Sequence, residues 1–338
     1  LFWLGVPFCD GGIPPQGRPM KKISVLILVL FLSMPLAWGQ PLKAQGIRSY
    51  AVLKAMPVLD DGRMKPFDTY ARNLLIRFSG KDTFDHKDAT QWLARLLFAP
   101  DLTKDDKIFL INNPDIALAL SITPESTRRY SFGQLQKNYP KFLELAQAAQ
   151  NISEKERSIV EAEIIRVFEN LRLYAQLSHE FAFVFPHADF NNSSFLDTAL
   201  SADHMRAVMA DVQRKDPGQY TDDERQTLGL LSNLFAWSLN YKGLPTAIIP
   251  LSKGDLWLSP WDAIARDFKD QGTRSLLTLW RNMAIAYWNG EQVEFDMAGR
   301  MAVDLIRGRL NKEEQGKFSK FPLEIAYHAA QPFLWAKV

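Results

Sequence analysis

One stretch near the N-terminus, Asp60–Arg72, constrains the local fold more tightly than any other part of the sequence. Asp-Asp-Gly at 60–62 is typical of a tight turn, because glycine adopts positive φ and an Asp side chain can bond its own backbone. Pro66 suits the first turn of a helix. Apolar residues then recur with helical spacing until Gly80, a typical helix terminator. The sequence therefore predicts a turn that leads directly into an amphipathic helix.

The charged residues of this stretch are candidate binding residues. Arg63 and Lys65 lie just before the predicted helix, and Asp68 falls in its first turn. The helix dipole favours an acidic side chain there, and the same side chain can pair with the two bases. Because Arg63 carries a planar fork suited to carboxylates, we expect an Arg63–Asp68 pair that acts as a structural clasp or as part of a docking surface. The alternative is a well-capped helix with an ordinary surface charge cluster.

The first 39 residues are expected to be absent from the mature protein. Residues 1–19 do not begin with Met, and we interpret them as upstream translation that is not native. Residues 20–39 combine a Lys-Lys start, an apolar run and small residues at the end, the pattern of a secretory signal peptide. We therefore predict export to the periplasm with cleavage near Gly39. An uncleaved membrane anchor is the alternative, although the apolar run is slightly short for a span of about 20 residues.

Charge and cysteine content narrow the class of function. The whole chain has 40 Lys and Arg against 38 Asp and Glu. Residues 1–39 hold three of these bases and one of the acids, so the remainder is formally neutral. A nucleic-acid-binding domain would show a basic excess, so we expect no nucleic acid among the partners. Cys9 is the only cysteine, and a mature protein without it has neither a disulfide nor a thiol for redox exchange.

Most of the sequence beyond the leader shows helical periodicity. We predict a mainly α fold, a multi-helix domain over residues 45–321 with a few short β-strands, followed by a helix over 322–338. The longest helix is expected to open at a capping box, Ser153-Glu154-Lys155-Glu156, and to end near Ser178. Other helix starts are predicted at Asp88, Ser131, Pro140, Thr221, Ser259, Thr273 and Phe295. Short strands are predicted within 108–111 and 244–251, and loops at 191–194 and 216–218.

No motif for catalysis or metal binding stands out in the sequence. None of the five histidines lies in a Cys-x-x-Cys-His or His-Glu-x-x-His motif. The sequence has no Gly-rich phosphate loop and no Gly-x-Ser-x-Gly. Its paired carboxylates are adjacent residues, which do not face each other as a glycosidase requires. The histidines are His86, His179, His187, His204 and His328.

Three stretches, taken in order, carry a family resemblance. The first is Pro57-Val58 followed by Gly-Arg-x-Lys-Pro-x-Asp-Thr-x-Ala-Arg, the second runs from Ile249-Pro250 to Trp257-Leu-Ser-Pro-Trp261, and the third is Leu323-Glu324-x-x-Tyr327 with Pro332-Phe333. Together they resemble the periplasmic region of the system II cytochrome c biogenesis proteins, the CcsB–CcsA or ResB/ResC-like type. The resemblance brackets residues of about 50 to 338.

The resemblance implies a role in joining haem to apocytochrome c outside the cytoplasm. The implied partners are a membrane haem-handling subunit and apocytochrome c. Haem would be handled by that assembly, with none bound by this chain alone. The chain would then be part of a cytochrome c synthetase, or haem lyase, rather than an enzyme by itself. It would be one half of a split system or a truncated product, with residues 322–338 leading toward a membrane segment that this sequence lacks.

Trp257 and Trp261 lie in the second stretch and are candidate binding residues. We expect both to pack in the interior, with an apolar surface for a haem edge or a peptide as the alternative. The competing hypothesis for the whole chain is a periplasmic binding or scaffold protein that serves another membrane complex and has no haem role. A hydrolase ranks below both, because the sequence shows no nucleophile or metal constellation.

Overall fold

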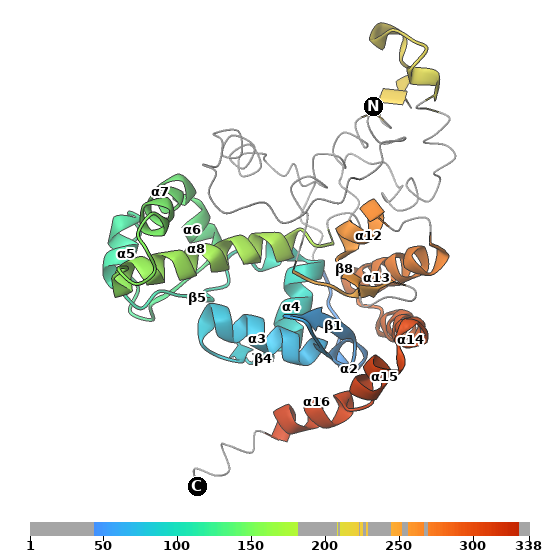
Figure 1. Cartoon of the computed structure of the whole chain (residues 1–338), viewed down its shortest axis with the longest axis horizontal. Coiled ribbons are helices and arrows are strands. Elements are labelled where there is room, and N and C mark those ends of the chain that lie inside the picture. The colour runs from blue at the N-terminus through green and yellow to red at the C-terminus, as the bar shows by residue number, and fades with distance from the viewer. Residues whose placement is uncertain are drawn as a thin grey trace. The chain divides into compact units, whose positions relative to one another are not determined.

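The computed structural model describes residues 44–181, 210–222, 245–251, 256–266 and 270–330, together with residues 208, 224, 225 and 228. The predicted signal peptide at 20–39, the loop at 191–194 and Pro332-Phe333 lie outside the described residues. Helices dominate, with a few two-stranded antiparallel sheets (Figure 1), so the prediction of a mainly α fold is confirmed. Within the described ranges, no helix combines the length and the apolar character needed to cross a membrane.

The opening stretch forms a β-hairpin that runs directly into a helix. Strands β1 (Pro57–Asp60) and β2 (Arg63–Pro66) pair antiparallel. Between them, Asp61 and Gly62 have φ angles of 51° and 70°. Two successive positive φ values suit the twist of a two-residue hairpin. The turn was predicted, but the two strands were not, because four-residue strands that begin or end with proline show too little alternation to be recognised.

Helices α3 and α4 lie against each other at the start of the domain. Helix α3 (Phe67–Ser79) follows Pro66 directly and ends at Gly80, whose φ is 69°. Helix α4 (Ala89–Phe98) begins at Asp88, whose carboxylate accepts the Gln91 backbone N–H at 2.9 Å. Both boundaries agree with the sequence prediction, because a cap or a left-handed terminator acts within one turn.

The remaining elements complete the helical domain (Figure 1). Three further strand pairs are β3 (Thr83–Phe84) with β4 (Lys87–Asp88), β5 (Phe109–Leu110) with β6 (Arg129–Tyr130), and β7 (Ile249–Pro250) with β8 (Trp257–Leu258). The other helices are α2 (Ala51–Lys54), α5 (Pro114–Ala119), α6 (Phe132–Gln136), α7 (Tyr139–Gln150), α8 (Ile159–Ser178), α12 (Pro260–Arg266), α13 (Gln271–Asn289), α14 (Gln292–Arg309), α15 (Lys312–Phe318) and α16 (Phe321–Ala330). Short 3-10 turns span Pro100–Leu102 and Pro217–Gln219.

Helix α8 begins later than predicted, at a different capping box. The Ser158 backbone N–H donates to Glu161 at 2.7 Å, and the Glu161 N–H donates to the Ser158 hydroxyl at 3.3 Å. Ser153 and Glu156 instead bond each other through their side chains at 2.6 Å. Arg157, between the two pairs, donates to carbonyls near the end of α7 and so keeps this segment in a turn. The predicted end at Ser178 is confirmed.

Helix α4 joins two clusters of buried aromatic side chains. Its Trp92 contacts Phe78 of α3, with ring centroids 5.8 Å apart. Its Phe98 contacts Trp280 and Tyr287 of α13 at 6.4 and 5.6 Å. Aromatic contacts of this kind stabilise a core beyond the area they bury. The helix therefore connects the N-terminal helices with α13 and α14, which pack together as a hairpin.

Candidate functional site

The first and third family-like stretches meet at one carboxylate. Arg63, in the hairpin, donates from Nη2 to Glu324 Oε2 at 2.9 Å. Thr69, in the first turn of α3, donates from its hydroxyl to Glu324 Oε1 at 2.7 Å. Glu324 lies on α16, which packs against β2 and α3 (Figure 1). Residues separated by 261 and 255 positions in sequence therefore share one carboxyl group.

The second stretch reaches the same hairpin through the residues just before it. The backbone N–H of Leu59 in β1 donates to the Ala247 carbonyl at 2.9 Å, which makes an isolated bridge beside the hairpin. The hydroxyl groups of Tyr70 and Thr246 lie 3.3 Å apart, and both residues are buried. Strand β7 begins two residues after Ala247. The second stretch is thus held against β1 and α3.

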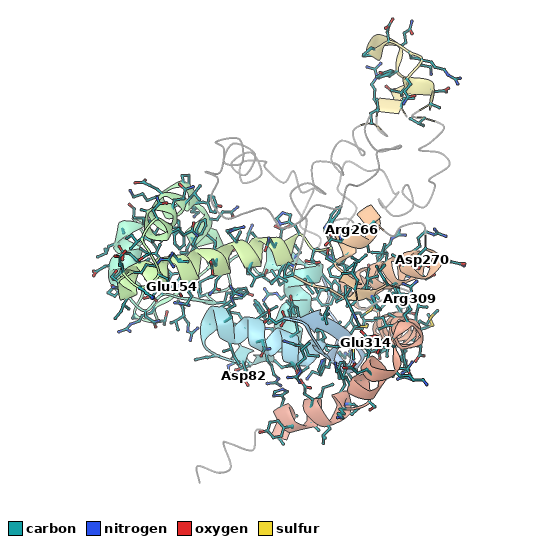
Figure 2. All side chains as sticks on the ribbon, in the orientation of Figure 1. Asp82, Glu154, Arg266, Asp270, Arg309 and Glu314 are labelled. Atoms are coloured by element: carbon teal, nitrogen blue, oxygen red, sulfur yellow. The ribbon has the colours of Figure 1, made fainter. Side chains whose placement is uncertain are left out.

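Polar contacts from the C-terminal helices hold the β7–β8 pair (Figure 2). Arg309, at the end of α14, donates to the Pro250 carbonyl at 2.8 Å and pairs with Asp270 at the start of α13. The indole N–H of Trp257 donates to Glu314 of α15 at 3.0 Å. Because α15 leads into α16, the second and third stretches are linked through consecutive helices. All three stretches therefore belong to one connected arrangement.

Arg63, Lys65 and Asp68 do not form the single cluster that the sequence suggested. Arg63 pairs with Glu324, while Lys65 is buried and pairs with Asp60 across the hairpin at 2.6 Å. Asp68 faces inward and binds other residues, so the expected Arg63–Asp68 pair is wrong. The reason is the direction in which the first turn of α3 faces. Thr69 shares Glu324 with Arg63, whereas Asp68 points into the interior toward Thr90 of α4.

Asp68 is the centre of a buried polar cluster. Its side chain is 1% exposed. One carboxylate oxygen accepts Arg72 Nε–H at 2.9 Å, and the other accepts the Thr90 hydroxyl at 3.0 Å. Lys54 Nζ lies 3.8 Å from the same carboxylate. A buried charge needs such partners to offset its desolvation, so Asp68 holds α2, α3 and α4 together.

Trp257 and Trp261 are both buried, with their indole N–H groups bonded. Trp257 donates to Glu314, as described above. Trp261, in α12, donates to the backbone carbonyl of His179 at 3.0 Å. This placement agrees with the expected packing role, and burial leaves neither ring available as a surface for a haem edge or a peptide.

Glu180 is a buried carboxyl group that no sequence pattern indicated. It is fully buried, and neither carboxyl oxygen has a well-formed hydrogen bond with another described residue. Burial raises the pKa of Glu180 well above its usual value, the charge of Asp262 adds to the rise, and the nearby Thr246 hydroxyl acts in the opposite direction. The protonated form is therefore favoured in the folded protein. Burial also disfavours the charged form of His179, the residue just before Glu180, and so lowers its pKa.

Other polar features of the described residues lie apart from the three stretches. These residues include no group of three or more His, Cys, Asp or Glu that could hold a metal ion. His187 and His204 lie outside the described part of the chain. An open cavity of about 330 Å³ is lined by residues of the α5–α7 region: Ser121, Ile122, Thr123, Glu125, Gln134, Lys137 and Asn138. None of these residues belongs to the family-like stretches.

Comparison with protein-family models found no family that matches the chain, and comparison with curated proteins found no match either. The residues of the three stretches and their contacts are therefore the observations that bear on function. Glu324 is the member whose role was not predicted. It was visible in the third stretch, but nothing in local spacing indicated that it would receive Arg63 and Thr69.

Proposed function

We propose that this chain is the periplasmic part of a system II cytochrome c biogenesis protein, split or truncated from its membrane half. It works beside a membrane haem-handling subunit and apocytochrome c, and haem is the cargo of that assembly. The proposal is supported by one observation above the others. The first and third stretches share the Glu324 carboxylate, and residues beside the second stretch bond the same hairpin, although the three stretches are far apart in sequence.

The contacts of Arg63 and Thr69 with Glu324 support the proposal, because forming the individual helices does not require them. A Pro-start or a capping residue acts within one turn of its own helix. Arg63, Thr69 and Glu324 instead join two distant parts of the chain. A contact between such distant residues is better explained by a shared surface than by separate helix starts.

The hairpin tip is the part of this surface that a partner can reach. The Arg63 side chain is 66% exposed although Glu324 fixes it from one side. A guanidinium group has five N–H donors, so one carboxylate partner leaves others free to bind backbone carbonyls or carboxylates. We assign Arg63 a docking role in the assembly, toward the membrane subunit or apocytochrome c.

Cytochrome c maturation with the membrane haem-handling subunit supplied would test the proposal. The chain carrying Arg63→Ala would be compared with the wild type by haem staining of the matured cytochrome. Arg266→Ala is the matched control, because Arg266 is similarly exposed, at 62%, and lies on α12 away from Glu324. We expect reduced maturation with Arg63→Ala, normal maturation with Arg266→Ala, and unchanged thermal unfolding of both variants.

Two results would contradict the proposal. Maturation that proceeds equally well without the chain would remove it from the pathway and favour the scaffold hypothesis. Equal maturation with Arg63→Ala and with the wild type would leave the chain in the pathway and remove the docking role of the hairpin tip.

A further inference from the structure

The outward face of α14 carries three large apolar side chains. Val293, Met297 and Met301 follow one another at four-residue intervals and are 72%, 56% and 54% exposed. Residues four apart lie above one another on a helix, so the three form a continuous stripe. The outward face of a surface helix is normally polar. The opposite face is the buried one, made of Phe295, Ala298, Gly299, Ala302 and Ile306.

The inward packing of α14 fixes the direction of this stripe. Helix α13 and helix α2 cover its buried face. The fit there is tight, since a Cβ atom added to Gly299 would lie 2.7 Å from Val52. The helix cannot rotate to bury the stripe without losing this contact. The apolar stripe is thus a fixed feature of the surface.

Two opposite charges flank the stripe symmetrically. Glu294 lies three residues before Met297, and Arg300 lies three residues after it. At 3.6 residues per turn, the two charges point roughly 60° to either side of Met297. Both side chains are exposed, and neither forms an ion pair with another residue in the described part of the chain. The charges are therefore available to an external partner.

We propose that this face of α14 binds the same face of a second copy of the chain, across a two-fold axis between the two Met297 side chains. Glu294 and Arg300 are displaced from Met297 by equal and opposite amounts, both along the helix and around it. When two such helices cross steeply about the axis, Glu294 of each copy therefore meets Arg300 of the other. Val293 and Met301 then lie beside their own counterparts.

Charge complementarity identifies the second copy as the occupant. A lipid surface is recognised by basic residues beside the apolar face, whereas this stripe has one charge of each sign. The flexible methionine side chains can adapt to each other at the crossing point. A steep crossing confines the contact to about two helical turns, below the ~800 Å² per partner of a standard interface. The dimer is therefore weak and forms at high protein concentration. The proposed dimer does not depend on the proposed function.

Charge reversal gives a direct test by sedimentation over a range of concentrations. Glu294→Arg and Arg300→Glu each create two like-charge contacts across the axis, and each should weaken the dimer at least about tenfold. The double variant restores both pairs with the signs exchanged and should recover the wild-type dissociation constant to within about threefold. Arg266→Glu, on α12, is the control for a change of net charge and should have no effect. Thermal unfolding of every variant should match the wild type, because all the positions are exposed.

Cysteine cross-linking gives an independent test of the axis. In a chain with Cys9→Ser, Met297→Cys places two thiols next to each other at the axis, and oxidation by air should give a covalent dimer. Lys141→Cys, an exposed helical position elsewhere, should remain monomeric under the same conditions. Failure of the double charge variant to dimerise, or equal cross-linking at both positions, would overturn the proposal. So would a monomer at all concentrations that binds phosphatidylglycerol vesicles through this stripe, since the occupant would then be lipid.

Discussion

Replacing Asp68 with alanine tests which charge pairs hold the start of α3. Its buried carboxylate accepts Arg72 Nε–H at 2.9 Å and the Thr90 hydroxyl at 3.0 Å. Removing one partner of a buried ion pair costs about 3–5 kcal/mol, because the other charge is stranded. Here Arg72 keeps Asp82 at 3.1 Å, so the stranded charge is partly compensated. The Thr90 hydroxyl loses its acceptor, which adds about 1–3 kcal/mol. We expect a total loss of about 3 kcal/mol in the free energy of unfolding.

Double-mutant cycles measured by urea unfolding separate the pairs. Asp68→Ala and Arg72→Ala should be coupled by more than about 1 kcal/mol, because their side chains are in direct contact. Arg63→Ala and Glu324→Ala should be coupled by about 0–1 kcal/mol, since Arg63 is largely exposed. Arg63→Ala and Asp68→Ala should add within about 0.5 kcal/mol, because they share no partner. Asp68→Asn is the control that keeps the side-chain volume and removes only the charge.

The double-mutant cycle for Arg63 and Asp68 gives the result that can refute this reasoning. Strong coupling between these two residues would mean that the guanidinium reaches Asp68 in solution and that the Glu324 contact is not the one that forms. A loss below about 1 kcal/mol for Asp68→Ala would instead place this carboxylate in water, where ion pairs contribute little. Either result would remove the physical basis for treating the cluster as the connection among α2, α3 and α4.

Three further predictions concern single positions. The free energy of unfolding should fall as pH rises above the usual glutamate value of 4.5, by up to about 1.4 kcal/mol per pH unit. The cause is that Glu180 loses its proton at a lower pH in the unfolded chain than in the folded protein. Glu180→Gln should remove this pH dependence. A difference in unfolding free energy between wild type and variant that stays constant with pH would contradict the prediction. Ser158→Ala should cost about 1 kcal/mol as the true cap of α8, whereas Ser153→Ala should cost far less; equal losses in thermal unfolding would restore the earlier capping box. Gly80→Ala should destabilise by about 1 kcal/mol because of its positive φ, while Gly316→Ala, inside α15 with open space around it, should stabilise by up to about 1 kcal/mol. A more stable Gly80→Ala variant or a less stable Gly316→Ala variant in urea unfolding would refute this last pair of predictions.

Helix starts were predictable wherever one side chain decides the local backbone. Asp88 and Ser131 accept the N–H three residues on, as their spacing predicts, at 2.9 and 3.2 Å. Ser259 does the same with Asp262 at 3.2 Å. Such contacts lie within one turn, so the sequence around them contains all the information needed. The two-residue turn before Arg63 was recognised for the same reason.

Choices that depend on tertiary contact were not predictable. Ser153–Glu156 and Ser158–Glu161 have the same capping-box spacing. The second opens α8 because Arg157 binds carbonyls at the end of α7, a contact that spacing does not encode. The partner of Arg63 was missed for a similar reason, since Glu324 lies 261 positions away. The sequence pattern thus indicated the wrong one of two equivalent boxes, and it indicated Arg63 without its partner.

Burial separates the charged residues of the opening stretch into two that stabilise the fold, Lys65 and Asp68, and one that a partner can contact, Arg63. Lys65 is buried and forms an ion pair with Asp60 across the hairpin. Asp68 is buried among three helices. Both are therefore out of reach of any partner that does not unfold the domain. Arg63 alone among the three predicted binding residues reaches solvent, and Glu324 holds it in place. A partner that recognises the charges of this stretch therefore binds at the hairpin tip. There Glu324 already orders one side of the Arg63 guanidinium group, so that side loses no further conformational freedom on binding.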